Sequence, residues 1–222
     1  MLNIHQLPND IVIDFETLWN LHPPKFPQVK IYGKMLNTPR WQQAYGMDYM
    51  FSGVVSHGLP TPDLLESLHE YAKTICPGFN GLLVNWYDGA LGHKIGAHRD
   101  DESSIVPGTP ILTISFGEER IFRLRKYKAK EKPIDYVVKD RDVLTLPWDV
   151  NQTYTHEVPH FKKYTGRRVS VTFRAFVGEY KALDKNYDSS FRPVEEFMPE
   201  DELLEWVTRL KWVTRLKELK GN

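Results

Sequence analysis

The sequence predicts an α+β protein with a jelly-roll core and helices from its N-terminal part over one face. Between residues 79 and 177, short apolar or alternating runs follow one another between turn residues, and no helical periodicity separates them. Before residue 79, two segments carry helical signals instead. A chain of 222 residues has room for one large domain with a sizeable core.

Two helices are predicted in the first third of the chain. Asn9 is a candidate cap for a short helix that ends at Trp19, before a Pro-Pro break. The second helix has Thr61 as its N-cap and Pro62 at its first position, and its apolar residues recur at helical spacing as far as Ile75. We expect its apolar face to cover a sheet.

At least six strands are predicted in the β-rich block. The runs that predict them are 82–87, 111–116, 120–127, 134–139, 143–146 and 168–177. Gly117-Glu118 and the turn at 140–142 lie where hairpins are needed. We expect residues 1–180 to form one domain, with recognition elements at about 25–60, and residues 181–222 to form a linker and an extra C-terminal helix. WVTRLK occurs twice there, at 206–211 and 212–217, and we give this repeat no functional role.

Composition limits the kind of partner. Lys+Arg and Asp+Glu number 29 each, and this net charge of +0 excludes binding to nucleic acids through overall charge. Cys76 is the single cysteine, which excludes an intrachain disulfide and a thiolate zinc site. The N-terminus lacks a signal-peptide pattern, and no apolar run of about 18 residues occurs. We therefore expect an intracellular monomer without membrane contact.

His98-Arg99-Asp100 and His156 form a candidate metal site. Residues two apart on a strand point the same way, so His98 and Asp100 can bind one ion while His156 adds a third ligand from a distant strand. His160 is a weaker rival, because Val158-Pro159 places it beyond the strand end. Two imidazoles and one carboxylate on one face of an octahedron leave three positions open, which suits Fe(II) and O₂ chemistry.

The last predicted strand carries two arginines that are candidates for binding a cosubstrate. Arg168 and Arg174 share its polar face, about 20 Å apart at roughly 3.3 Å per residue. Two guanidiniums that reach toward each other can hold the ends of a short dicarboxylate such as 2-oxoglutarate. The alternative is a pair of solvated surface arginines on a half-exposed strand.

Several motifs together resemble the AlkB-type Fe(II)/2-oxoglutarate dioxygenases. They are Asn85-Trp86-Tyr87, the stretch from His98 to Glu102, the PILTISFG run at 110–117, His156, and the strand at 168–174. Segments before this core resemble the eukaryotic nuclear branch of the family, which acts on duplex DNA. These segments are Ile31-Tyr32-Gly33, Pro39-Arg40, 42–46 and 49–53. The likeness runs from about residue 29 to residue 177.

The resemblance implies a double-stranded β-helix as the form of the jelly roll, and a role for each matching residue. The implied catalytic residues, which bind Fe(II), are His98, Asp100 and His156. Those implied for 2-oxoglutarate are Asn85 and Arg174 at its C1 end and Tyr87 and Arg168 at its C5 end. The implied substrate-binding set is Tyr49 and Phe51 against a flipped base, Asp101 and Glu102 at its polar edge, Tyr32 and Gly33 in the gap left in the duplex, and Arg40.

The implied activity is oxidative dealkylation of N-alkylated bases, such as 1-methyladenine and 3-methylcytosine, in DNA. Duplex is the expected substrate, with single strands also accepted, and the products are succinate, CO₂ and formaldehyde. Such a substrate places a eukaryotic protein in the nucleus. The alternatives are an RNA- or protein-directed oxygenase, an inactive nucleic-acid-binding relative, and a metal-binding β-barrel enzyme that uses no 2-oxoglutarate.

A basic run supplies candidate phosphate contacts. The run consists of Arg123, Arg125, Lys126, Lys128, Lys130 and Lys132, and its first five members are the candidate contacts. The alternative is a solvated hairpin edge protected by its charge. One departure from the family pattern affects the cosubstrate site, because Ser170 stands where the family usually has Asn.

Overall fold

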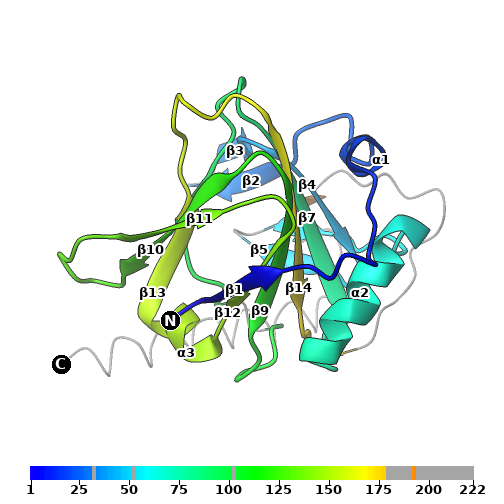
Figure 1. Cartoon of the computed structure of the whole chain (residues 1–222). Helices are drawn as coiled ribbons and strands as arrows, with labels where there is room; N and C mark the ends of the chain where they lie inside the picture. The colour runs from blue at the N-terminus through cyan, green and yellow to red at the C-terminus, as the bar shows by residue number, and fades with distance from the viewer. Residues whose placement is uncertain (32–33, 52–53, 102–103, 179–191, 194–222) are drawn as a thin grey trace.

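Two antiparallel sheets face each other across a cavity, and the first two helices of the chain pack outside the larger one (Figure 1). The computed structural model describes residues 1–31, 34–51, 54–101, 104–178 and 192–193. The larger sheet has the strand order β1-β12-β9-β14-β7-β4, and the smaller has the order β11-β10-β13-β8. A β2–β3 hairpin and a small sheet of β15, β6 and β5 lie beside them. This arrangement agrees with the predicted jelly roll.

The elements have the following bounds. The larger sheet contains β1 (Asn3–Gln6), β4 (Trp41–Tyr45), β7 (Gly81–Asp88), β9 (Ile111–Gly117), β12 (Asp142–Leu146) and β14 (Arg167–Arg174). The smaller contains β8 (Ile95–His98), β10 (Arg120–Lys126), β11 (Ile134–Val138) and β13 (Tyr154–Val158). The remaining strands are β2 (Gln28–Ile31), β3 (Lys34–Asn37), β5 (Tyr49–Phe51), β6 (Val54–Ser56) and β15 (Arg192–Pro193). The helices are α1 (Phe15–Trp19), α2 (Asp63–Ile75) and α3 (Trp148–Thr153).

Strand β14 separates the core from the cavity by its alternation. Val169, Val171 and Phe173 are fully buried in one apolar cluster with Leu65 and Leu68 of α2. Burial of each such side chain contributes about 1.5–3 kcal/mol to folding. Alternate residues of a strand point to opposite faces, so the polar residues of β14 turn toward the cavity.

The predicted strands are confirmed, with bounds that differ by one to three residues. Both helix starts were placed wrongly. Helix α1 begins after Asp14, whose carboxylate accepts a hydrogen bond from the Thr17 N–H at 2.8 Å, so Asn9 is not its cap. In α2, Pro62 itself occupies the N-cap position that we assigned to Thr61.

Gly117 makes the tight turn between β9 and β10. Its φ is +86°, and an added Cβ would lie 2.4 Å from the Arg167 carbonyl oxygen, so glycine is required there. The predicted C-terminal helix and the WVTRLK repeat lie outside the described residues, although Arg192–Pro193 pairs with β6. No helix in the described part of the chain is long and apolar enough to cross a membrane.

Candidate metal and cosubstrate site

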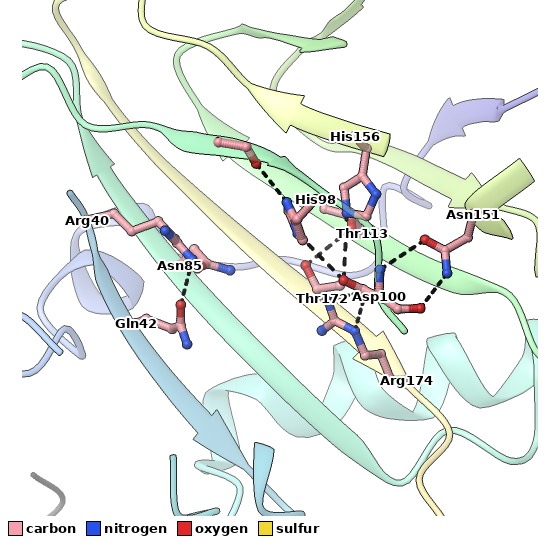
Figure 2. Close-up of polar contacts among 11 residues, drawn as sticks. Arg40, Gln42, Asn85, His98, Asp100, Thr113, Asn151, His156, Thr172 and Arg174 are labelled. Carbon is pink, nitrogen blue, oxygen red and sulfur yellow. Dashed lines mark hydrogen bonds and ion pairs between the residues drawn. The ribbon is translucent and has the colours of Figure 1, made fainter. Parts of the chain in front are cut away.

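Three ligand side chains converge at the edge of the smaller sheet where β8 pairs with β13. His98 ends β8 and is paired across the sheet with His156 of β13, and Asp100 follows two residues later. Asp100 Oδ1 lies 3.6 Å from His98 Nε2 and 3.8 Å from His156 Nε2. One ligand atom from each residue lies within 4.8 Å of the others, so one ion can touch all three (Figure 2). The predicted triad is therefore brought together, while His160 lies outside this group, beside Gly92.

The charge state of the triad suits a cation. Burial raises the pKa of Asp100, but the Arg174 guanidinium and the two imidazoles outweigh it and lower that pKa to about 2. Burial, followed by the neighbouring His98, lowers the pKa of His156 to about 3, and burial also lowers that of His98. At neutral pH the site therefore offers one carboxylate and two neutral imidazoles, the forms that bind a metal.

Hydrogen bonds aim the ligand atoms at one point. Arg174 Nε donates to Asp100 Oδ2 at 2.7 Å, which leaves the buried Oδ1 without a hydrogen bond among the described residues. His98 Nδ1 lies 2.8 Å from the Gly96 carbonyl oxygen, so it carries the proton and Nε2 is free to act as a ligand. An unpaired buried carboxylate oxygen facing two imidazole nitrogens fits a divalent metal such as Fe(II).

Asn151 was not predicted and holds the Asp100 backbone in place. Its side chain is fully buried, its Oδ1 accepts from the Asp100 N–H at 3.2 Å, and its Nδ2 donates to the Asp100 carbonyl at 2.7 Å. Asn151 lies on α3, which leads directly into β13 and His156. One side chain therefore connects the two segments that carry the ligands.

Arg168 supplies a buried receptor for a carboxylate. It is 2% exposed, and its Nη2 donates to Ser115 Oγ at 2.8 Å. Its buried Nε and Nη1 make no hydrogen bond of normal geometry to any described residue, and the guanidinium lies 5.1 Å from the centre of the Tyr87 ring. Arg174 is 4% exposed, so the alternative of two solvated surface arginines is wrong.

The cavity between the sheets measures about 680 Å³, within the usual range for small-ligand sites. Arg40, Arg168 and Arg174 line it as buried guanidiniums, and within the described residues the buried carboxylate that pairs with one of them is that of Asp100, with Arg174. Buried charges are stable when paired, so this excess of positive charge fits a dianion such as 2-oxoglutarate.

A family comparison agrees with this geometry. Residues 19–174 match the model of the 2OG-Fe(II) oxygenase superfamily. The chain belongs to this superfamily, and to the AlkB family within it. Iron and 2-oxoglutarate are accordingly its cofactor and cosubstrate.

Named relatives are similar over the same region. The chain is 34% identical to human "DNA oxidative demethylase ALKBH2" over 158 residues, which is 66% of this chain and 60% of that protein. It is 33% identical to the mouse protein of the same name, over 66% of each chain. Identity to rat "Alpha-ketoglutarate-dependent dioxygenase alkB homolog 3" is 31%, over 61% of this chain and 50% of that one. The chain therefore spans about half to two thirds of the length of these oxygenases.

The residues predicted to contact a base are only partly described. Tyr49 lines the cavity, and its ring centre lies 5.0 Å from the Arg174 guanidinium. Asp101 lies at the cavity mouth, where its carboxylate accepts from Arg99 Nη2 at 3.2 Å. Arg40 is buried rather than exposed to a bound duplex. Tyr32, Gly33, Glu102 and the side chain of Phe51 lie outside the described residues.

The basic run lies on the β10–β11 hairpin of this AlkB-family chain. Arg123 pairs with Asp135 at 2.6 Å, Arg125 with Glu157 at 2.8 Å, and Lys126 with Glu131 at 2.8 Å. Lys128 and Lys130 are exposed. Their predicted contact with phosphates stays a prediction, and the acidic partners reduce the charge that the first three offer.

Proposed function

We propose that the protein removes alkyl groups oxidatively from N-alkylated bases in DNA, with duplex as its main substrate. The observation that carries this proposal is a triad whose two histidines line the same cavity as Tyr49, Arg168 and Arg174. Relatives named as DNA oxidative demethylases support the choice of substrate. A DNA substrate would place the protein with the genome, in the nucleus of a eukaryotic cell.

The side chains divide the work between holding and orienting. When bound, Fe(II) with 2-oxoglutarate and O₂ supplies the oxidant that hydroxylates an N-linked methyl carbon, and formaldehyde then leaves the base. His98, Asp100 and His156 would hold the ion from one side. Arg168 would bind the far carboxylate, and Arg174 would keep Asp100 turned toward the ion while reaching the near carboxylate.

Features of the pocket favour a damaged base. Methylation at adenine N1 or cytosine N3 fixes a positive charge and abolishes Watson–Crick pairing. Asp101 would attract that charge at the mouth of the cavity. Flipping an unpaired base costs less than flipping a paired one, where the cost is a few kcal/mol. Tyr49 would then offer a ring on which the base stacks.

The test is mass spectrometry of oligonucleotides that carry 1-methyladenine or 3-methylcytosine, offered as duplex DNA, single-stranded DNA and RNA. With Fe(II), 2-oxoglutarate and O₂, we expect loss of the methyl mass, formation of formaldehyde, and the highest rate on duplex. Asp100→Ala is the inactive control. A folded, iron-loaded wild-type protein that leaves all three forms of DNA and RNA unchanged would contradict the proposal.

A further inference from the structure

A buried arginine lies between two amides at the β4 end of the cavity (Figure 2). Arg40 is 6% exposed, and its Nε donates to Asn85 Oδ1 while its Nη2 donates to Gln42 Oε1, both at 2.7 Å. Among the described residues, the ionisable groups that affect Arg40 most are the phenols of Tyr87 and Tyr49, and no carboxylate is among them. The guanidinium therefore donates its hydrogen bonds to two uncharged amide oxygens.

These hydrogen bonds fix which way each amide faces. An amide whose oxygen points at Arg40 must turn its NH₂ group away from Arg40. Gln42 is 1% exposed and lines the cavity, and its Nε2 is buried without a hydrogen-bond partner in the described chain. A buried donor without a partner is costly, so Gln42 Nε2 indicates a ligand that brings an acceptor.

The strand order assigns the two amides to different ligands. Asn85 is paired with Ser170 of β14, the strand that carries Arg168 and Arg174. Gln42 is paired with Asn85 but lies one strand further out, on the edge strand β4. Neighbouring strands are about 4.8 Å apart, so Gln42 lies about two spacings from the arginine strand. Tyr87 and Tyr49 both lie close enough to Arg40 to affect its electrostatics, so this guanidinium borders the cosubstrate side and the expected base side of the cavity.

The family pattern already gives Asn85 to 2-oxoglutarate. We propose that Arg40 is a positioning residue that turns the NH₂ group of Asn85 toward that cosubstrate and presents the NH₂ group of Gln42 to an acceptor atom of the substrate base. Gln42 is thereby a specificity-determining residue. The assignment of Gln42 rests on the proposed function, whereas that of Asn85 needs only the cosubstrate. Arg40 acts through the two amides instead of contacting DNA itself.

Two isosteric changes test the orientation of each amide. Asn85→Asp and Gln42→Glu keep an oxygen for Arg40 but replace the NH₂ group by an acceptor. We expect Asn85→Asp to raise the Kd for 2-oxoglutarate at least about tenfold, in anaerobic titrations of the Fe(II)-loaded protein followed by visible absorbance. Gln42→Glu should leave that Kd within about twofold and raise KM for a methylated duplex about tenfold. Gln152→Glu, an exposed change outside the cavity lining, is the charge control.

A double-mutant cycle tests the role of Arg40. Arg40→Lys keeps the charge but loses the fork, so we expect it to produce both defects, with an unchanged thermal midpoint within a few degrees. In the Asn85→Ala background, Arg40→Lys should cause no further loss of 2-oxoglutarate affinity. Additive losses, or an Arg40→Lys protein with wild-type Kd and KM, would overturn the proposal.

The repair assay and the 2-oxoglutarate titration together distinguish a failure of this inference from a failure of the proposed function. A wild-type protein that repairs no oligonucleotide contradicts the proposed function and the assignment of Gln42. The 2-oxoglutarate titration does not depend on repair, so it decides the role of Arg40 and Asn85 in either case. Equal effects of Gln42→Glu and Asn85→Asp on 2-oxoglutarate binding would overturn the division between the two amides.

Discussion

At the scale of single residues, the site is defined by buried polar groups that the protein leaves without partners. Asp100 Oδ1, Arg168 Nε and Nη1, and Gln42 Nε2 are all buried and make no hydrogen bond of normal geometry to a described residue. Most buried polar atoms in folded proteins make hydrogen bonds, so several buried polar atoms without one around a single cavity indicate that ligands bind there. Their chemistry differs in a useful way, because the carboxylate suits a metal and the guanidinium suits an anion.

Asn151 should control metal affinity without touching the metal. Asn151→Ala removes both hydrogen bonds to the Asp100 backbone, and we expect the Kd for Mn(II), measured by calorimetry, to rise about tenfold. Asn80→Ala is a matched control, because Asn80 makes the same pair of bonds to the backbone of Phe176. It should lower stability and leave the Kd unchanged, whereas equal Kd values for all three proteins would contradict the role of Asn151.

The buried imidazole of His156 should make the metal-free protein sensitive to acid. Its folded pKa of about 3 lies below the ordinary value of 6.5, so as pH falls through this window the unfolded state gains a proton that the folded state does not. Stability should fall by up to about 1.4 kcal/mol per pH unit from this group. Urea unfolding in EDTA between pH 6 and pH 4 measures how the free energy of unfolding changes with pH. We expect this dependence to be weaker in His156→Gln than in the wild type. Equal dependence in the two proteins would contradict this role of His156.

At the scale of elements, the strands could be predicted from the sequence, whereas side-chain hydrogen bonds between distant segments could not. The alternation along β14 correctly placed two arginines on one face and three apolar residues on the other, because period two is a local property. The H-x-D spacing likewise placed His98 and Asp100 together. The Asn151–Asp100 and Arg40–Asn85 hydrogen bonds join residues 51 and 45 positions apart, for which no local pattern exists.

The apolar face of β14 should carry much of the stability. Phe173 is fully buried against the α2 layer, so Phe173→Ala should cost about 3–5 kcal/mol in the free energy of unfolding by urea. Val137→Ala, at a position 45% exposed on β11, should cost less than about 0.5 kcal/mol. Similar losses for both variants would contradict the assignment of the core.

At the scale of the whole molecule, charge is balanced overall and separated locally. A net charge of +0 provides no general attraction to DNA, so binding must depend on local patches and on the cavity. On the β10–β11 hairpin, ion pairs with acids already occupy Arg123, Arg125 and Lys126. The sequence alone did not reveal this pairing, because the acids lie on other strands or across a turn.

DNA binding should therefore depend most on Lys128 and Lys130. If each contacts a phosphate, replacing both by Ala should reduce the slope of log K against log salt for a methylated duplex by about 1.8. Fluorescence anisotropy titrations at salt concentrations from about 50 to about 200 mM measure this slope. Arg123→Ala should change the slope less, and an equal or larger change would show that the paired residues carry the contact.

The central claim is that one ferrous ion and one 2-oxoglutarate bind together between the triad and Arg168. Anaerobic titration of the metal-free protein with Fe(II) and 2-oxoglutarate measures this most directly, through the visible absorbance of the chelated ion. We predict one equivalent of each, with the signal lost in Asp100→Ala and the 2-oxoglutarate Kd raised in Arg168→Met. A folded wild-type protein without this signal, or full binding by Asp100→Ala, would contradict the account.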